Sequence, residues 1–309
     1  MLIKRSVVLA KIQTDAAIPA VPTPANDAVL VEGLTYNFSN QKMAEQGDVS
    51  SPLINKKQSL FGGALFDVSF AVRLKGSGAA GTAPEWGALM QGCGFDETIV
   101  AITSVTYAPL SLGHKYITLY VYEDGFLFPI NACQGSVSFE GEAGGNILAQ
   151  FNFTGHVGTQ TTAALPAPTL DDVQAPVLRG NSFTVGGASA ILSKLSVAVE
   201  NEISINPNVN SADGFADPVI ISRSVSGSID PLVAAGDING FINDWQTNQV
   251  RAIDTGVIGS VAGNKLQIAM PETSYNDAGF EDANGQRKLG LPFMAHDQAG
   301  DDSISLVVT

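Results

Sequence analysis

Charged residues are scarce in this sequence, and basic residues are the scarcest. Lysine and arginine supply 16 residues against 30 from aspartate and glutamate, which gives a formal net charge of −14. A nucleic-acid binder needs clustered lysine and arginine to neutralise phosphates, so the composition disfavours tight or sequence-specific DNA binding. Only 15% of the residues are charged, below the roughly 25% of soluble globular chains. This low charge favours a protein that hides part of its surface in an assembly.

Cysteine and histidine are also rare. The cysteines are Cys93 and Cys133, without a C-x-x-C motif, so neither a disulfide framework nor a zinc-finger spacing is present. The histidines, His114, His156 and His296, lie far apart in loop-like contexts. No spacing unites them in a metal site or a catalytic triad. We therefore expect no catalytic residue, no cofactor and no metal.

Long apolar runs are absent as well. No segment approaches the roughly 20 apolar residues of a membrane-spanning helix. The opening, MLIKRSVVLAKIQTD, has only five uncharged residues, Ser6 to Ala10, before Lys11. A signal-peptide core needs about 7–15 such residues. The sequence predicts a chain that is made in the cytoplasm and does not itself bind membranes.

The sequence is rich in alternating apolar and polar residues, the pattern of half-buried strands. In FDVSFAVRL, Phe66, Val68 and Phe70 share one face, while Asp67 and Ser69 share the other. The segments ITLYVYEDG and GSVSFEGEAGGNILAQFNFTG repeat the pattern beside Asp-Gly and Gly-Gly turns. In the second half it continues in SKLSVAVENEISI, VIISRSVSGSI, LQIAMPET, RKLGLPFMAHD and SISLVV. The sequence therefore predicts a mainly β fold built from antiparallel sheet.

Two short segments have helical periodicity, with apolar residues at i, i+3, i+4 and i+7. The first stripe consists of Trp86, Leu89, Met90 and Cys93, and the second of Ile238, Phe241, Ile242 and Trp245. Pro84 and Gly94 suit the start and the end of the first helix, and Asp237 can cap the second. We predict that both stripes pack on the core. Cys93 is then a buried apolar side chain rather than a nucleophile.

The two helices and the strands before them indicate an internal duplication. Trp86 and Ile238 are 152 residues apart, and Leu74 and Ile229, which end the preceding strands, are 155 apart. Half the chain has about the same length, so strands, a short helix and further strands occur twice. Two proline-rich stretches complete the organisation. We predict an N-terminal extended arm at 1–28, a first module at 29–159, a linker at 160–176 and a second module at 177–309.

Paired carboxylates lie on the polar side of two predicted strands, one pair in each half. Glu140 and Glu142 form the first pair, and Glu200 and Glu202 form the second. Like charges at i and i+2 must face water, so they lie on an ordinary solvated sheet face or line an acidic channel for a polyanion. The segment NPNVNSADGFAD (206–217) is either a polar hairpin tip or a loop that holds a cation loosely.

The sequence resembles the major tail tube proteins of long non-contractile-tailed (siphovirus-type) bacteriophages. The resemblance lies in diffuse patterns of hydrophobicity and turns over most of the chain. In the first half it rests on LAKIQTDAAIPAVPTPANDAVLV, PEWGALMQGCGF, YAPLS followed by ITLYVYEDG, and QGSVSFEGEAGGNILAQFNFTG. In the second half it rests on VIISRSVSGSID, the helix and LQIAMPET.

This resemblance implies two tandem β-sandwich or half-barrel modules, each flanked by a short α-helix. In that family, sheets of neighbouring subunits join around a lumen, six modules usually form a ring, and rings stack into a tube. The lumen holds the tape-measure protein during assembly and passes DNA during ejection. The implied location is the virion tail, and the implied partners are other copies of the chain, the tape-measure protein, and the tail tip and tail terminator proteins.

Duplication sharpens the expected ring, because three chains with two modules each supply six modules. We expect a trimer with pseudo-sixfold symmetry, with a hexamer as the alternative. The proline-rich stretch at 16–28 and the long segment at 39–60 are candidates for reaching the next ring, since both exceed the length of tight connections.

Two other classes of protein remain open from the sequence. One is a different β-sandwich structural protein, such as a capsid decoration protein, a tail fibre subunit or an adhesin. The other is a polysaccharide hydrolase, which needs a carboxylate pair in a cleft and exposed aromatic side chains. Trp86 and Trp245 are the only tryptophans, and both lie on predicted core stripes, which disfavours the enzyme.

Overall fold

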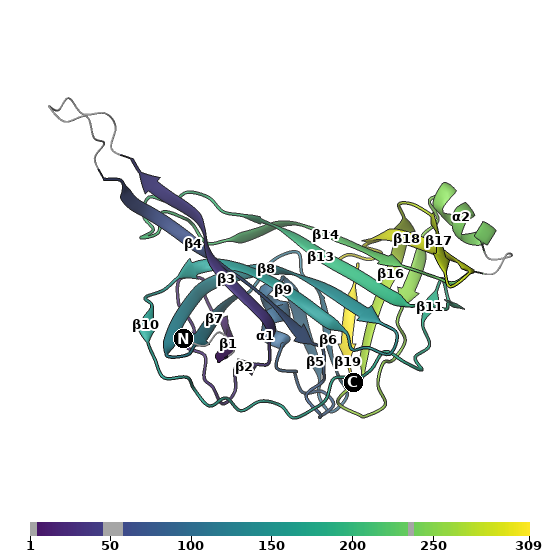
Figure 1. Ribbon diagram of the computed structural model, residues 1–309, viewed down its shortest axis with the longest axis horizontal. Helices are drawn as coiled ribbons and strands as arrows, with labels where there is room; N and C mark the ends of the chain where they lie inside the picture. Colours follow the sequence, from purple (N-terminus) through teal and green to yellow (C-terminus); the bar gives the residue numbers. More distant parts are fainter. Residues whose placement is uncertain (1–4, 46–57, 234–237) are drawn as a thin grey trace.

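The computed structural model describes residues 5–45, 58–233 and 238–309. It confirms the predicted mainly β fold, in which extended antiparallel sheet accompanies two short helices (Figure 1). The helices in the described residues are too short to cross a membrane. Asp237, the expected cap of the second helix, lies outside the described residues.

The first half contains one helix and nine strands, followed by a short strand within the linker region. These elements are β1 (Ser6–Gln13), β2 (Ala28–Val29), β3 (Glu32–Ala44), β4 (Leu60–Arg73), α1 (Gly87–Gly92), β5 (Phe95–Val100), β6 (Ser104–Pro109), β7 (Tyr116–Glu123), β8 (Phe126–Glu142), β9 (Leu148–Val157) and β10 (Thr161–Thr162). Strand β8 is central, because it pairs with β9 along one edge and with β7 along part of the other.

The second half repeats the order of strand hairpin, helix and further strands. Its elements are β11 (Thr184–Val185), β12 (Ala188–Ser189), β13 (Lys194–Ser204), β14 (Val219–Ile229), α2 (Ile238–Gln246), β15 (Arg251–Asp254), β16 (Leu266–Tyr275), β17 (Gly279–Ala283), β18 (Gln286–His296) and β19 (Ser305–Val308). The hairpins β3–β4 and β13–β14 occupy equivalent places, since β4 pairs with β9 and β14 pairs with β18.

Strand pairing joins the two halves at two places. Strand β13 pairs antiparallel with the end of β8, and β19 pairs antiparallel with β6. One sheet therefore runs from β3 through β4, β9, β8, β13, β14 and β18, and continues through β16 and β19 to β6 and β5. The halves also share one hydrophobic core, in which Phe139 of β8 and Val197 of β13 are both buried.

The N-terminal segment differs from the expected arm. Residues 6–13 form β1, which pairs with β7 over its whole length from Ser6 opposite Glu123 to Gln13 opposite Tyr116. Val8 and Leu9 are fully buried, because the uncharged run before Lys11 faces the core. The proline-rich residues that follow remain without long strands.

The predicted linker at 160–176 is held against both halves. Its first residues form β10, which pairs with β8, and the rest lacks regular structure. Lys75 Nζ donates to the carbonyl of Asp171 at 2.7 Å, and Asn264 Nδ2 donates to the carbonyl of Gln174 at 2.8 Å. Because one anchor comes from each half, this stretch is fixed rather than a free tether.

Helix α1 is embedded in the core. The residues of its predicted stripe, Trp86, Leu89, Met90 and Cys93, are fully buried. Trp86 precedes the helix and donates its indole N–H to the carbonyl of Lys75 at 2.8 Å. Gly94 follows the helix with φ of 78°, the left-handed conformation that glycine adopts without steric cost.

Helix α2 is buried less deeply than α1, although Ile238, Phe241 and Trp245 of its predicted stripe pack against the hydrophobic core. Ile238, Phe241, Ile242 and Trp245 are only partly buried. Helix α1 contacts β1, β5, β7 and β8, whereas α2 packs mainly on β16. No strands equivalent to β5 and β6 lie between α2 and β15 in the chain, so the second helix has fewer elements around it.

A long hairpin formed by β3 and β4 extends away from the body (Figure 1). Its base is held by the loop between β13 and β14. Lys42 Nζ donates to the carbonyl of Gly214 at 3.1 Å and lies 3.7 Å from the centre of the Phe215 ring. At Gly63, an added Cβ would meet the Asp213 carbonyl oxygen at 1.8 Å, so only glycine permits this close approach.

A polar pair from the second half stabilises the end of α1. Asn201 Nδ2 donates to the carbonyls of Cys93 and Gly135, each at 2.7 Å. Arg223 donates to Asn201 Oδ1 at 3.1 Å and to the carbonyl of Gly94 at 2.7 Å. Burial lowers the pKa of Arg223 from its usual value. These bonds satisfy carbonyls that a helix leaves free at its C-terminus.

The difference in burial between the helices predicts different costs of truncation. Trp86→Ala should lower the free energy of unfolding by about 3–5 kcal/mol, because a large cavity remains in the core. Trp245→Ala, the matched variant in α2, should cost about 1–2 kcal/mol, because less apolar surface leaves water there. Denaturant unfolding followed by far-UV circular dichroism measures both values. Equal losses would contradict the unequal packing of α1 and α2.

The Asn201–Arg223 pair predicts that the halves lose stability together. Arg223→Ala removes a charged donor from buried oxygens and should cost about 2–3 kcal/mol. Arg287→Ala, at an exposed position, should change stability by less than about 0.5 kcal/mol. Calorimetry should show one unfolding transition for both variants, since the halves share a core. Two separated transitions would show that the halves unfold independently.

Candidate functional site

The outer face of the wide sheet carries polar and small side chains on β4, β9, β8, β13 and β14. We call this set the polar face. It consists of Asp67, Ser69, Ala71 and Arg73; Leu148, Gln150, Asn152 and Thr154; Ser136, Ser138, Glu140 and Glu142; Lys194, Ser196, Ala198, Glu200 and Glu202; and Ser222, Ser224, Ser226 and Ser228. Their strand neighbours turn inward, because successive side chains point to opposite faces.

The polar face is continuous across the junction of the halves. In one row, Ala71 lies opposite Gln150, then Ser138, Ala198 and Ser226 follow on successive strands. The opposite face is apolar, and Phe151, Phe139 and Val197 are buried there. The polar face therefore requires both halves of the chain, because neither half alone contains all of its strands.

Hydroxyl and amide groups dominate the polar face, and its carboxylates outnumber its cations. Some of these groups bond to one another, as where Gln150 Nε2 donates to Ser69 Oγ at 2.8 Å and Thr154 Oγ1 donates to Asp67 Oδ1 at 2.7 Å. Short polar side chains bind water and offer few apolar or cationic contacts to a passing molecule. The surface therefore suits sliding contact better than tight binding.

All four predicted acidic residues lie exposed on the polar face, but they do not form one cluster. Glu140 and Glu142 lie opposite Ser196 and Lys194 at the start of β13. Glu200 and Glu202 lie further along β13, opposite Ser224 and Ser222 of β14. Glu140 and Glu200 are thus separated along the strand direction by about 13 Å, at ~3.3 Å per residue.

The four glutamates were predicted from the sequence, but the hydroxyl groups around them were not. The row of serines on β14, Ser222, Ser224, Ser226 and Ser228, is visible in the alternation of VIISRSVSGSI. An i, i+2 series of serines across a strand is the signal that finds this face. The order of the strands, which makes the face continuous, is not visible in any local pattern.

The cysteine thiols lie away from the polar face. Cys93 and Cys133 are both fully buried, and desolvation by burial raises the pKa of each thiol. A nucleophilic cysteine requires the opposite shift. The stripe that contains Cys93 therefore belongs to the core and not to a reactive site.

The histidines remain separate, and each has its own partner. His114 Nε2 lies 2.7 Å from the carbonyl of Leu110, and His296 Nε2 lies 2.7 Å from Ser274 Oγ. His156 lies between two carboxylates of the loop at 206–217. Its Nδ1 contacts Asp213, and its Nε2 is 3.1 Å from Asp217 Oδ1.

The loop at 206–217 uses its oxygens internally. Asp213 accepts hydrogen bonds from Ser211 and from the backbone N–H of Phe215, besides its contact with His156. Although burial opposes the shift, these hydrogen bonds and the charge of His156 lower the pKa of Asp213. The part of the chain that the structure describes contains no group of three acidic, histidine or cysteine side chains arranged to hold a metal.

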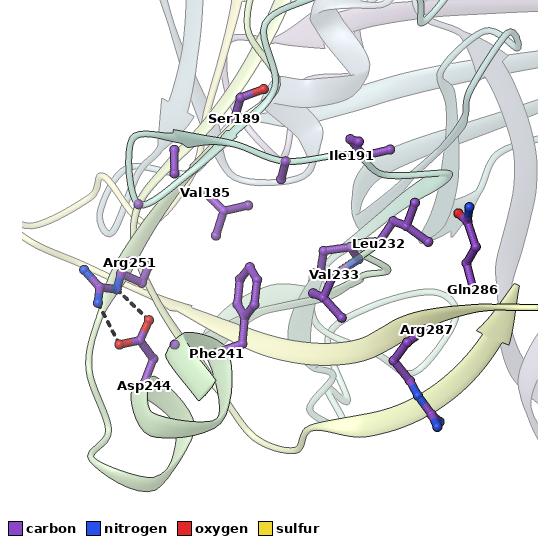
Figure 2. Close-up of a pocket in the computed structure, with 15 residues that line it drawn as sticks. Val185, Ser189, Ile191, Leu232, Val233, Phe241, Asp244, Arg251, Gln286 and Arg287 are labelled. Atoms are coloured by element: carbon purple, nitrogen blue, oxygen red, sulfur yellow. Dashed lines mark hydrogen bonds and ion pairs between the residues drawn. The ribbon is translucent and has the colours of Figure 1, made fainter. Parts of the chain in front are cut away.

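A cavity of about 800 Å³ lies beside α2 in the second half. Figure 2 shows Phe241 of α2 facing an apolar wall that includes Val185, Leu232 and Val233. At one side Arg251 makes two hydrogen bonds to Asp244, at 2.7 and 2.8 Å. The cavity lies beside the helix that is only partly buried.

Comparison with known proteins gives one family match. The family model described as phage tail tube protein matches residues 4–295, nearly the whole chain. A search of curated proteins finds no match. The match favours a tube protein over the capsid decoration protein, tail fibre, adhesin or hydrolase that the sequence left open. It also agrees with the mainly β architecture built on one large sheet. We conclude that this chain belongs to the phage tail tube protein family: it is a structural protein of the phage tail that assembles with its own copies into a tube.

Proposed function

We propose that copies of this chain form rings that stack into the tube of a long non-contractile, siphovirus-type tail, with the polar face turned to the lumen. The observation that carries the proposal is the continuity of this face over both halves of the sheet. A tube that conducts other molecules needs an uninterrupted inner wall. The apolar face on the other side of the same strands supplies the core of the wall.

The lumen would hold the tape-measure protein during assembly and conduct DNA during ejection. Because Glu140, Glu142, Glu200 and Glu202 are exposed on the polar face, phosphates are repelled from the wall rather than bound. Arg73 and Lys194 are the basic residues of the face. Arg73 is neutralised by Glu32, whose carboxylate accepts two hydrogen bonds from the guanidinium.

Three chains should close one ring with pseudo-sixfold symmetry. The junction between β8 and β13 already joins the two modules inside each chain, so a ring of three chains presents six modules to the lumen. Closure also removes the free edges of the sheet, which otherwise promote uncontrolled association.

The hairpin of β3 and β4 is our candidate for the contact between stacked rings. It extends beyond the body of the subunit (Figure 1), and the loop at 206–217 fixes its base. The tail tip protein and the tail terminator protein would bind at the two ends of the tube. The chain would be synthesised in the cytoplasm of the host bacterium and would then be located in the virion tail.

Ring symmetry is the first test of this function. Electron microscopy of tails or of concentrated protein should show tubes of uniform bore, and averaged cross-sections should have threefold symmetry with six similar lobes. Native mass spectrometry of isolated rings should give three chains. Six chains per ring would show that each chain contributes only one module to the lumen. An absence of tubes would overturn the proposed function.

The charge of the wall is the second test. Glu200→Lys places a cation on the polar face in every chain of the tube. DNA release from particles triggered in vitro should slow by about tenfold, the effect of ~1.4 kcal/mol of added attraction, and the delay should shrink at high salt. Asp172→Lys, with the same charge change on the linker, is the matched control. Equal effects of both variants would show that the polar face does not meet DNA.

A further inference from the structure

Strand β3 at one end of the wide sheet has a free edge, as do β5 at its other end and β17 beside β18. Among the described residues, β3 pairs only with β4, and β17 pairs only with β18. β17 lies beside α2 at the right of Figure 1, far from β3. An open strand edge presents unpaired N–H and C=O groups to any partner that can add a strand. The free edges of β3 and β17 can therefore accept a strand from outside the chain.

The chain contains an example of how such edges combine. At the internal junction, β8 and β13 pair antiparallel, with Glu140 opposite Ser196, Phe139 opposite Val197 and Ser138 opposite Ala198. Phe139 and Val197 turn inward and are buried, whereas Glu140 is exposed on the polar face. This junction is complete without a second chain.

Strand β3 is the first-half equivalent of β13. In the first half, Tyr36 lies opposite Val68, which lies opposite Phe153 of β9. In the second half, Val197 lies opposite Gly227, which lies opposite Phe293 of β18. With Phe153 of the first row matched to Phe293 of the second, Tyr36 is the equivalent of Val197. The preceding residues are then equivalent as well: Thr35 corresponds to Ser196, and Leu34 corresponds to Leu195.

Strand β17 is the second-half equivalent of the end of β8. Phe280 lies opposite Leu289 on β18, and Phe139 lies opposite Ala149 on β9. Leu289 precedes Phe293 by the same four residues by which Ala149 precedes Phe153. Phe280 is therefore the equivalent of Phe139.

The neighbouring residues of β17 agree with this alignment. Glu281 takes the place of Glu140, and Gly279 takes the place of Ser138. Glu281 lies opposite Lys288 and on the polar side of the sheet, because Phe280 next to it shares the inner side with the buried Leu289.

We propose that β17 of one chain adds to β3 of the next copy in the ring and repeats the β8–β13 junction between chains. The register places Glu281 opposite Thr35, Phe280 opposite Tyr36, and Gly279 opposite Asn37 of the neighbouring copy. This pairing rests on the proposed ring and identifies its contact surface. The free edges of β3 and β17 are then both occupied.

Exposed apolar side chains at both edges support the pairing. Phe280 is 56% exposed, whereas its equivalent Phe139 is 1% exposed. On β3, Phe38 is 40% exposed and stacks edge-on against Phe66 at 5.0 Å. Tyr36 also contacts Phe66, at 5.7 Å between ring centres. Phe280 of a neighbouring chain would extend this aromatic group and leave water, as Phe139 does inside the chain.

The polar residues of the two junctions correspond as well. A hydroxyl residue lies opposite a glutamate in each, Ser196 opposite Glu140 within the chain and Thr35 opposite Glu281 between chains. Neither edge places like charges directly opposite each other, which would oppose pairing. The occupant that fits each edge is thus a second copy of this chain.

Disulfide trapping tests the register. Thr35→Cys and Glu281→Cys are combined in one chain, and tubes are isolated from phage tails and oxidised. Directly opposed residues of an antiparallel pair have Cβ atoms within disulfide reach. Non-reducing gels should show covalent species of more than one chain that end at three chains in a closed trimer. The natural cysteines are both buried and should not contribute.

Two control pairs of cysteines test whether the geometry permits a disulfide and whether the cross-link depends on register. Glu140→Cys with Ser196→Cys should form a disulfide within one chain. The protein then migrates as a monomer, which shows that two cysteines in this geometry can form a disulfide. Thr35→Cys with Asp282→Cys shifts the register by one residue and turns one thiol to the opposite face, so it should not cross-link between chains.

The outcomes separate this inference from the proposed function. Tubes in which Thr35→Cys and Glu281→Cys remain unlinked, while the internal control oxidises, overturn the β3–β17 pairing but leave the tube. Cross-linking of the shifted pair in place of the designed one also overturns it. Covalent species that end at six chains support the pairing and replace the trimer by a hexamer. An absence of tubes from the unmodified protein contradicts the ring itself.

A second variant measures the contribution of the aromatic contact. Phe280→Lys should prevent ring formation, as seen by sedimentation and electron microscopy, and should leave the melting temperature of the subunit nearly unchanged because Phe280 is largely exposed. Leu112→Lys replaces a side chain that is 85% exposed in a loop and should assemble normally. Normal assembly of Phe280→Lys would overturn the pairing.

Discussion

The antiparallel pairing of β13 with β8 is the constraint on which the rest of the structure depends. It brings Val197 against Phe139 on the inner side and Ser196 beside Glu140 on the outer side. Since successive residues of a strand point to opposite faces, this one register fixes both the shared core and the continuous polar face. A shift by one residue would exchange the two faces of β13 and place Glu200 in the core.

The two halves keep a common order of elements but differ in how they are filled. Helix α1 is enclosed, and Asn201 and Arg223 of the second half bond to the carbonyls at its end. Helix α2 is half-buried beside a cavity. Both halves thus contribute buried residues to the shared core, and the second half also supplies the polar anchors of α1. Unequal halves of this kind are possible because neither needs to fold alone.

Local pattern in the sequence was enough to predict the strands and both helices. Alternation in FDVSFAVRL and the stripe of Trp86 and Leu89 report burial directly. Interactions between distant residues were not predictable in this way. Strand β1 was expected to be an arm, because its partner β7 lies more than 100 residues later. The alternation placed Glu140 and Glu200 on outer faces, but their separation depends on the β8–β13 register.

The difference between the two hairpins has a consequence for how subunits stack. The hairpin of β3 and β4 projects from the body, whereas the loop between β13 and β14 folds back on the base of that hairpin. In the proposed ring of three chains, the long hairpin would project once from each chain. Only the first half of each chain would then reach toward the next ring.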